Sequence, residues 1–245
     1  MKILKIENLK KNYHTKKREY HAVDNFSLNI DKGEFVAIVG PSGCGKSTIL
    51  SILCGLENKS GGKIKYNKNL KFGYMLQGDN LFEWRTIYKN CLLGLEIQNK
   101  LEKKEYVDKL LKTYGLYDFK DSYPNELSGG MRQRVALIRT LATKPDILLL
   151  DEPFSALDYQ TRLAVSDDVY KIIKKEKITV IMVTHDISEA VSMADKVIVL
   201  TKSPSTIKSI YEIKLNNKKT PIENRKDKNF PYYYDKIWKD IDYHV

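Results

Sequence analysis

Long apolar runs are missing from this sequence of 245 residues. No stretch approaches the ~18 consecutive apolar residues of a membrane-spanning helix, and the cleanest runs are as short as Ile147 to Leu150. The first eleven residues alternate charged and apolar side chains, unlike a secretory leader. We therefore expect the chain to be made and kept in the cytoplasm.

Paired cysteines are also missing. The three cysteines, Cys44, Cys54 and Cys91, form no CxxC pair, and their odd number fits a reduced cytosol. Internal repeats and low-complexity segments are absent as well. With 42% hydrophobic and 30% charged residues, the composition is that of a globular protein long enough to bury a sizeable core.

Acidic residues are outnumbered by basic ones, 31 to 42, which gives a formal net charge of +11. A basic balance can indicate nucleic acid, an anionic membrane surface or anionic ligands as partners. Here the lysines are scattered rather than gathered in one motif. The pattern therefore favours a solvated basic surface, and we expect no nucleic-acid partner.

Strands and helices alternate along the chain. Short strands are expected over 1–40, a helix over 46–56 and two further strands over 62–76. Apolar residues then recur at helical spacing over 86–120, a third helix follows Ser128, and two buried strands each lead into a helix. This alternation predicts an α/β fold with a mostly parallel sheet covered on both faces.

The C-terminal part changes character at residue 216. A polar, charged stretch is followed by Tyr234, Ile237, Trp238 and Ile241, which fall on one face of a helix. About 30 residues are too few for a second core. We therefore expect residues 216–245 to be a short extension with one helix that caps the domain, rather than a regulatory domain.

The segment GPSGCGKST, residues 40–48, matches the phosphate-loop pattern GxxxxGK[ST] between an expected strand and an expected helix. Gly43 and Gly45 let the backbone curl so that successive N–H groups point at phosphate oxygens. The helix from Lys46 adds its positive end. In this pattern Lys46 reaches the β- and γ-phosphates and Ser47 binds Mg²⁺. The predicted nucleotide-binding residues of the loop are Gly40, Pro41, Ser42, Gly43, Cys44, Gly45, Lys46, Ser47 and Thr48. Cys44 is interpreted as a filler rather than a nucleophile.

Two apolar strands deliver polar residues to one sheet edge, where ligands bind in open α/β sheets. The first ends in Asp151, expected to hold Mg²⁺, and Glu152, expected to orient and polarise the attacking water. The second ends in His185. Its imidazole can donate a hydrogen bond to the γ-phosphate and can hold the attacking water in line.

The segment LSGGMRQRV, residues 127–135, is a helix start on which Ser128 is a suitable N-cap and Gly129 and Gly130 leave the first N–H groups open. It also resembles the signature motif of ABC ATPases, whose other motifs occur here in the family's order. Gln77 resembles the Q-loop glutamine, the segment ending at Asp158 resembles the D-loop, and His185 resembles the switch histidine. Tyr13 resembles the residue that stacks on adenine, with Tyr20 as a competitor.

The resemblance covers roughly residues 1–215. It implies a P-loop NTPase (RecA-like) core with an antiparallel β subdomain and a helical subdomain inserted at about 86–142. It implies ATP and Mg²⁺ as cofactors, and catalytic roles for Glu152, His185 and Gln77. The implied metal site is Ser47, Gln77 and Asp151. The nucleotide would also be bound across a head-to-tail homodimer by Ser128, Gly129, Gly130, Gln133 and Asp158.

The segment LFEWRT, residues 81–86, resembles the LLPWRT segment of ATPases from nitrate, sulfonate and taurine importers, with Glu83 where proline is usual. That group implies a peripheral subunit on the cytoplasmic face of the membrane. Its permease subunits would dock near Gln77 to Asn90, and a substrate-binding protein would act indirectly. Trp84 is interpreted either as a core residue or as a permease contact. The rival hypothesis is a soluble ABC ATPase that acts on nucleic acid or ribosomes.

Overall fold

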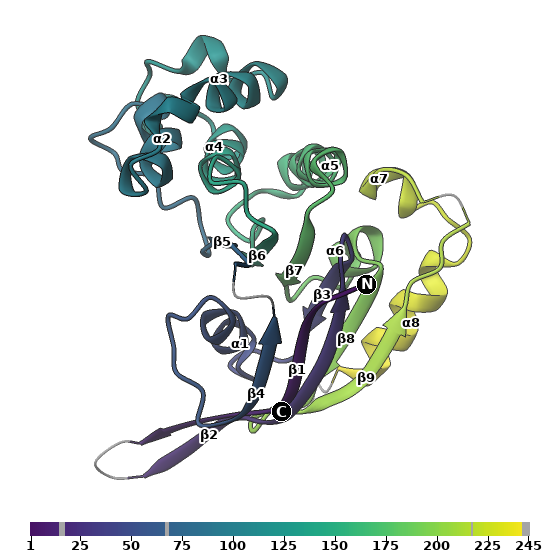
Figure 1. The fold of residues 1–245 in the computed structure, drawn as a ribbon. Coiled ribbons are helices and arrows are strands. Elements are labelled where there is room, and N and C mark those ends of the chain that lie inside the picture. Colours follow the sequence, from purple (N-terminus) through teal and green to yellow (C-terminus); the bar gives the residue numbers. More distant parts are fainter. Residues whose placement is uncertain (15–17, 67–68, 217, 242–245) are drawn as a thin grey trace. The chain divides into compact units, whose positions relative to one another are not determined.

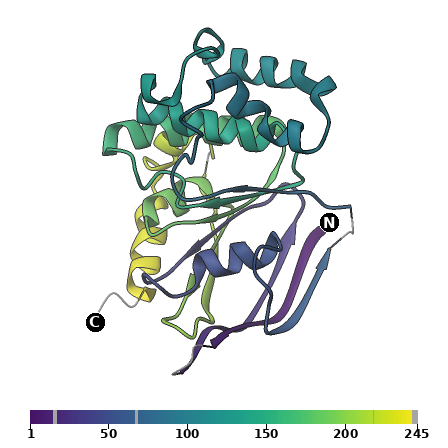
Figure 2. The same ribbon diagram turned by 90° about the vertical axis from the view of Figure 1, so that its left-hand side faces the viewer.

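The computed structural model describes residues 1–14, 18–66, 69–216 and 218–241. The chain forms two compact units (Figures 1 and 2). The first unit is made of Met1–Leu70 and Lys177–Val245, and the second of Lys71–Glu176. None of the helices in the described residues is both long and apolar enough to cross a membrane.

The first unit contains a three-stranded antiparallel sheet with the order β2-β1-β4. Its strands are β1 (Lys2–His14), β2 (Glu19–Asp31) and β4 (Gly61–Tyr66). Leu4, Ile6 and Leu9 are buried in β1. Leu4 and Ile6 follow the alternation expected of a strand, and a register shift between Ile6 and Leu9 interrupts it. Both β1 and β2 run for 13 residues, so the expectation of short strands is wrong for this hairpin. Its far end consists of exposed and half-buried residues that are held by backbone pairing rather than by burial.

A second group of strands in this unit has the order β7-β3-β8-β9. These strands are β3 (Phe35–Val39), β7 (Thr179–Val183), β8 (Lys196–Leu200) and β9 (Ile207–Glu212). Strand β3 pairs in parallel with β7 and β8, and β9 is antiparallel to β8. Every residue of β3 and β7 is buried, which is why these strands read as continuous apolar runs rather than as alternating ones.

The helices of the first unit are α1 (Lys46–Leu53), α6 (Ile187–Met193), α7 (Pro221–Asn224) and α8 (Phe230–Asp240). The expected single C-terminal helix is α8, and the structure adds the short α7. Thr220 and Glu223 form a capping box with Pro221 at the first turn, which explains why so short a helix forms. Both helices pack on α6, where Asn224 Nδ2 donates to the Ser192 carbonyl at 2.7 Å and Ile237 is fully buried.

The second unit combines two parallel strands with a set of helices. The strands are β5 (Phe72–Met75) and β6 (Ile147–Asp151), and the helices are α2 (Ile87–Ile97), α3 (Lys104–Thr113), α4 (Gly129–Leu141) and α5 (Tyr159–Glu176). Single 3₁₀ turns, Leu101–Lys103, Tyr117–Phe119 and Pro124–Glu126, join them. Helices α2, α3 and α4 lie between β5 and β6 in the sequence. They are the expected helical insertion in an α/β chain.

Candidate nucleotide-binding site

The glycine loop follows β3 and leads into α1, as its pattern predicts. Gly43 and Gly45 have φ values of +72° and +101°, a region that glycine adopts without strain. A Cβ on Gly45 would also lie 3.1 Å from the Ala22 carbonyl oxygen. Gly45 is the N-cap of α1 and, among the described residues, no side chain caps this helix. The loop therefore ends at a helix N-terminus whose dipole favours an anion.

Lys46 lies inside this loop. Its side chain is buried, and Nζ donates hydrogen bonds to the carbonyl oxygens of Gly40 and Pro41, both at 2.9 Å. Ser42 and Ser47 are exposed, and Thr48 is half-buried. A buried ammonium beside exposed hydroxyls and glycine backbone suits a polyphosphate, so the residues present fit the predicted ligand.

Cys44 is the one apolar anchor within the loop. Its side chain is almost fully buried. Burial raises the pKa of its thiol, although the charge of Lys46 opposes this effect. The thiol therefore stays protonated at neutral pH, which fits a filler and not a nucleophile.

The two tyrosines proposed for adenine stacking face one another across the hairpin, since Tyr13 on β1 pairs with Tyr20 on β2. The Lys11 ammonium lies 4.5 Å from the centroid of the Tyr13 ring, a cation–π contact. The Tyr20 hydroxyl instead donates to the Gly43 carbonyl at 3.3 Å, and this ring is 43% exposed. The structure thus links Tyr20, and not Tyr13, to the glycine loop by a hydrogen bond.

His185 follows β7 in the first unit, and its side chain is exposed. The residues on either side of it fix the start of α6. Asp186 caps this helix by accepting from the N–H groups of Ser188 and Glu189, and the buried Thr184 hydroxyl donates to Glu189 Oε2 at 2.7 Å. The imidazole therefore sits on a firmly held turn.

The carboxylates end β6 in the second unit, where Gln77 also lies. Asp151 is buried, and its Oδ2 accepts a hydrogen bond from the Tyr74 hydroxyl at 3.0 Å. Glu152 Oε2 accepts from Gln77 Nε2 at 3.4 Å, a long contact. The structure therefore brings Gln77 beside Glu152, which lies 75 positions further along the sequence and directly follows Asp151.

The backbone of Glu152 is strained. Its φ of +45° lies in the left-handed region, which costs an L-residue with a Cβ roughly 1–2 kcal/mol. The turn is held by the Ser155 N–H and hydroxyl, which both donate to the Glu152 carbonyl, at 3.2 and 3.1 Å. Such strain is common at functional positions that need one fixed side-chain direction.

Helix α4 begins as the sequence predicts. Ser128 is its N-cap, and the Ser128 hydroxyl accepts from the Met131 N–H at 3.3 Å. A Cβ on Gly130 would lie 2.9 Å from a Thr161 methyl and 3.0 Å from a Val165 methyl, so this glycine allows α4 to approach α5 closely. A Cβ on Gly129 would lie 3.3 Å from a Leu157 methyl and 4.0 Å from the end of the Arg132 side chain, so it meets less crowding. The two glycines thus have different structural roles.

Two further predicted residues also lie in the second unit. Gln133 is buried and donates from Nε2 to the Pro153 carbonyl, which ties α4 to the turn after Glu152. Asp158 is exposed, and its Oδ1 accepts from the Thr161 N–H at 3.0 Å. Hydrogen bonds from Thr161 lower the pKa of Asp158 below its usual value.

Sequence analysis missed the residues that connect the Gln77 loop to α4. Asp79 Oδ2 pairs with Arg132 Nε at 2.9 Å, and Arg139 donates to the backbone carbonyls of Asp79 and Asn80 at 2.8 and 2.7 Å. Both arginines lie on the helix that Ser128 caps. Arg132 and Arg139 are seven positions apart, about two helical turns, and so lie on one helix face; this spacing is the only signal the sequence offers for them.

The loop after Gln77 displays an aromatic side chain. Trp84 is 75% exposed and stacks on Phe82, with ring centroids 4.9 Å apart, so its interpretation as a core residue is wrong. Asn90 explains how the loop holds this position. It is fully buried, accepts from the Phe82 N–H, and donates to the carbonyls of Phe82, Arg85 and Thr86.

A strand, a glycine loop with a buried lysine and a helix that starts at that loop define a P-loop nucleotide-binding protein. Comparison with known proteins refines this class. The ABC transporter family model matches residues 23–155, more than half of the chain. The chain belongs to the ABC transporter family, and its activity is that of an ABC ATPase.

Its relatives agree with this assignment. An uncharacterized ABC transporter ATP-binding protein of Bacillus subtilis (strain 168), YtlC, is 42% identical over 98% of this chain and 96% of its own length. The aliphatic sulfonates import ATP-binding protein SsuB of the same organism is 39% identical over 83% of each chain. These relatives confirm the suspected importer group.

A solved structure confirms the fold class. The dimeric ABC transporter cassette MJ0796 has a TM-score of 0.73 and 31% identity, and the match covers 86% of this chain and 99% of that one. A second structure of MJ0796 shows it as a dimer in a post-hydrolysis state bound to ADP and Pi. The expected P-loop core with an antiparallel β subdomain and inserted helices is therefore confirmed.

Proposed function

We propose that this chain is the ATP-hydrolysing subunit of an importer for a small anionic or heterocyclic solute, of the nitrate, sulfonate or thiamine-precursor type. The sulfonate import protein among its relatives supports this class of solute. Such a subunit would act at the cytoplasmic face of the membrane, beneath separate permease subunits. A substrate-binding protein would select the solute outside.

The start of α4 is the observation that carries the proposal. One chain has two helix N-termini suited to phosphate, the one after Gly45 and the one after Ser128. A single triphosphate held between the Lys46 loop of one subunit and the Ser128 to Gly130 turn of another would be stabilised by both dipoles. Two chains would then form a head-to-tail homodimer with ATP at each interface.

Each predicted residue has a role in this arrangement. Lys46 and the glycine loop would bind the β- and γ-phosphates, and Tyr13 or Tyr20 would stack on adenine. Glu152 would orient and polarise the attacking water, and His185 would hold it in line with the γ-phosphate. The hydroxyl of Ser47 and the carbonyl or carboxylate oxygens of Gln77 and Asp151 would hold Mg²⁺, since hard oxygen ligands are those that Mg²⁺ prefers. The ion would neutralise phosphate charge. Gln133 and Asp158 would complete the nucleotide contacts.

The dimer can be tested with Glu152→Gln, which keeps the size of the side chain. We expect this variant to bind Mg-ATP and to lose roughly 10²–10⁴-fold in hydrolysis, the usual loss on removing a general base. The trapped complex should have twice the 28.4 kDa mass of one chain in light scattering. Lys46→Ala in the same background should remain a monomer, because its phosphate contact is lost. A Glu152→Gln protein that stays monomeric at saturating Mg-ATP would contradict the proposal.

The permease contact is tested at Trp84. We expect Trp84→Ala to prevent co-purification with the permease while ATP hydrolysis by the isolated subunit is unchanged, because this ring is exposed and lies outside the catalytic groups. Ile97→Ala is a matched control, since Ile97 is 74% exposed in the same unit and lies outside the 77–90 segment. Equal permease capture by wild type, Trp84→Ala and Ile97→Ala would exclude Trp84 from the contact. The rival function on nucleic acid or ribosomes is not proposed, because the relatives named above are transporter and import proteins.

A further inference from the structure

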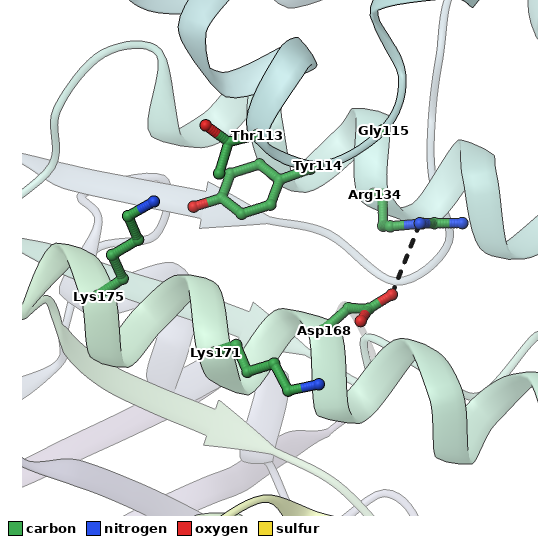
Figure 3. A pocket seen from close by; sticks show the side chains of 7 residues that line it. All are labelled: Thr113, Tyr114, Gly115, Arg134, Asp168, Lys171 and Lys175. Carbon is green, nitrogen blue, oxygen red and sulfur yellow. Dashed lines mark ion pairs between the residues drawn. The ribbon is translucent and has the colours of Figure 1, made fainter.

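A cavity in the second unit has a lining that the proposed function does not use. It measures about 460 Å³ and lies where the end of α3 meets α4 and α5 (Figure 3). Thr113, Tyr114 and Gly115 come from the end of α3, and Arg134 comes from α4. The last three lining residues, Asp168, Lys171 and Lys175, are spaced by three and four positions along one face of α5.

The lining is rich in positive charge. Arg134, Lys171 and Lys175 supply three cations, and Asp168 supplies the single carboxylate. Arg134 NH1 and Asp168 Oδ2 are 3.6 Å apart, which is an ion pair but too long for a hydrogen bond. Among the seven lining residues three cations outnumber one carboxylate, and the two lysines are exposed, so an anion that enters the cavity would meet a net attraction.

The lining is also rich in hydrogen-bond donors that lack acceptors. Within the described part of the chain, the buried Arg134 Nε and the buried Tyr114 hydroxyl have no hydrogen-bond partner. In Figure 3 the Tyr114 hydroxyl and the Lys175 ammonium point toward one another. Burial, together with the negative charge of Glu176, raises the pKa of Tyr114 to about 12. The phenol is thus a donor at neutral pH, and a buried donor without a partner costs stability.

These features exclude several occupants. An apolar ligand would leave the guanidinium and the phenol unsatisfied, and a cation would be repelled by three positive side chains. The nearby Glu176 carboxylate cannot accept hydrogen bonds from all of the lining donors, because its Oε2 already accepts from the Tyr106 hydroxyl at 3.0 Å. An occupant with several acceptor oxygens and two negative charges would satisfy the lining.

We propose that this cavity binds a tetrahedral dianion, a phosphate or sulfate group carried by a small molecule or as the free ion. Arg134 would bind two of its oxygens, as a planar guanidinium binds oxyanions. Lys171 and Lys175 would neutralise its charge, and the Tyr114 hydroxyl would donate to it. The site does not rest on the proposed importer function, since it uses none of the predicted ATP-site residues.

The test is calorimetric titration with inorganic phosphate at constant ionic strength. All proteins carry Lys46→Ala, which removes phosphate binding at the glycine loop. We expect Lys171→Gln with Lys175→Gln to weaken binding roughly 10-fold or more, because two charge-assisted contacts are lost. Lys174→Gln is the matched control. It lies on the same helix, outside the lining and over the Tyr170 ring, and should change the affinity less than about 2-fold.

A second variant separates binding from folding. Tyr114→Phe removes only the hydroxyl, so the melting temperature should stay level or rise while the affinity for phosphate falls. Sulfate should compete with phosphate, and chloride at equal ionic strength should not. Sulfate competition together with weaker binding of phosphate esters would identify the free ion as the ligand, and tighter binding of the esters would identify a phosphorylated small molecule. No phosphate binding to the Lys46→Ala protein, or equal affinity in the lysine pair and the Lys174→Gln control, would overturn the site.

Discussion

The strained backbone of Glu152 predicts an unusual ranking of two substitutions. At most positions alanine is more stable than glycine by ~0.4–1 kcal/mol, because glycine has more conformational freedom to lose on folding. At a φ of +45° the ranking should reverse. An alanine there keeps the left-handed cost of roughly 1–2 kcal/mol, and a glycine removes it.

The difference between these terms leaves Glu152→Gly more stable than Glu152→Ala by about 0.8 kcal/mol. In a chain of this size that corresponds to a melting temperature about 2–3 °C higher. Both variants lose the carboxylate and its contact with Gln77, so these effects cancel. Both should also lose roughly 10²–10⁴-fold in ATP hydrolysis, because no base remains to polarise the water.

The assay is thermal unfolding followed by circular dichroism, together with phosphate release from ATP. Lys177 is a matched control, since it is exposed with a φ of +53° and is not among the predicted site residues. The melting temperature of Lys177→Gly should exceed that of Lys177→Ala by a similar margin. Both variants should hydrolyse ATP at the wild-type rate. If Glu152→Ala melts at or above Glu152→Gly while the Lys177 pair shows the reversal, the backbone of Glu152 is not strained as described.

Two further predictions concern the second unit. Gly130→Ala should lower the free energy of unfolding in urea by ~1–3 kcal/mol, because the new methyl group would overlap Thr161. Gly129→Ala should lower it by less than half as much. Equal losses would refute the close approach of α4 and α5. Burial raises the pKa of the Cys91 thiol from 9.0 to about 12, so the folded state holds this proton while the unfolded state releases it. The free energy of unfolding should therefore fall as pH rises above 9. In Cys91→Ala this fall should be shallower by up to about 1.4 kcal/mol per pH unit. Equal pH dependence in the wild type and the variant would contradict this.

Local sequence patterns predicted the elements that depend on local physics. The glycine loop, the Ser128 cap and the buried strand ending at Asp151 are each encoded by consecutive residues, and the structure has them where expected. The long β1–β2 hairpin was not predicted, because its far end contains polar residues such as Asn12 and has no apolar alternation to reveal it. Backbone pairing alone extends it, and pairing leaves no trace in composition.

Contacts between residues far apart in the chain could also not be predicted from the sequence. The ion pair of Asp79 with Arg132 joins residues 53 positions apart, and nothing in either segment specifies the partner. The same holds for the Tyr20 hydroxyl on the Gly43 carbonyl, 23 positions away. Sequence reasoning could name both tyrosines as candidates for adenine stacking, but it could not tell which one contacts the loop.

The exposed Trp84 excludes the core residue, one of the two interpretations that the sequence left open for this side chain. An aromatic side chain usually gains more from burial than from exposure, so the core was a reasonable interpretation. The structure instead uses the buried Asn90 to bond four backbone groups of the 82–86 loop, which leaves the ring outside. A fully satisfied buried amide costs little, and losing it would free the loop. The ring stacks on Phe82 and is otherwise open to solvent, as single apolar side chains on protein surfaces often are, so an aromatic residue in this segment need not belong to a core.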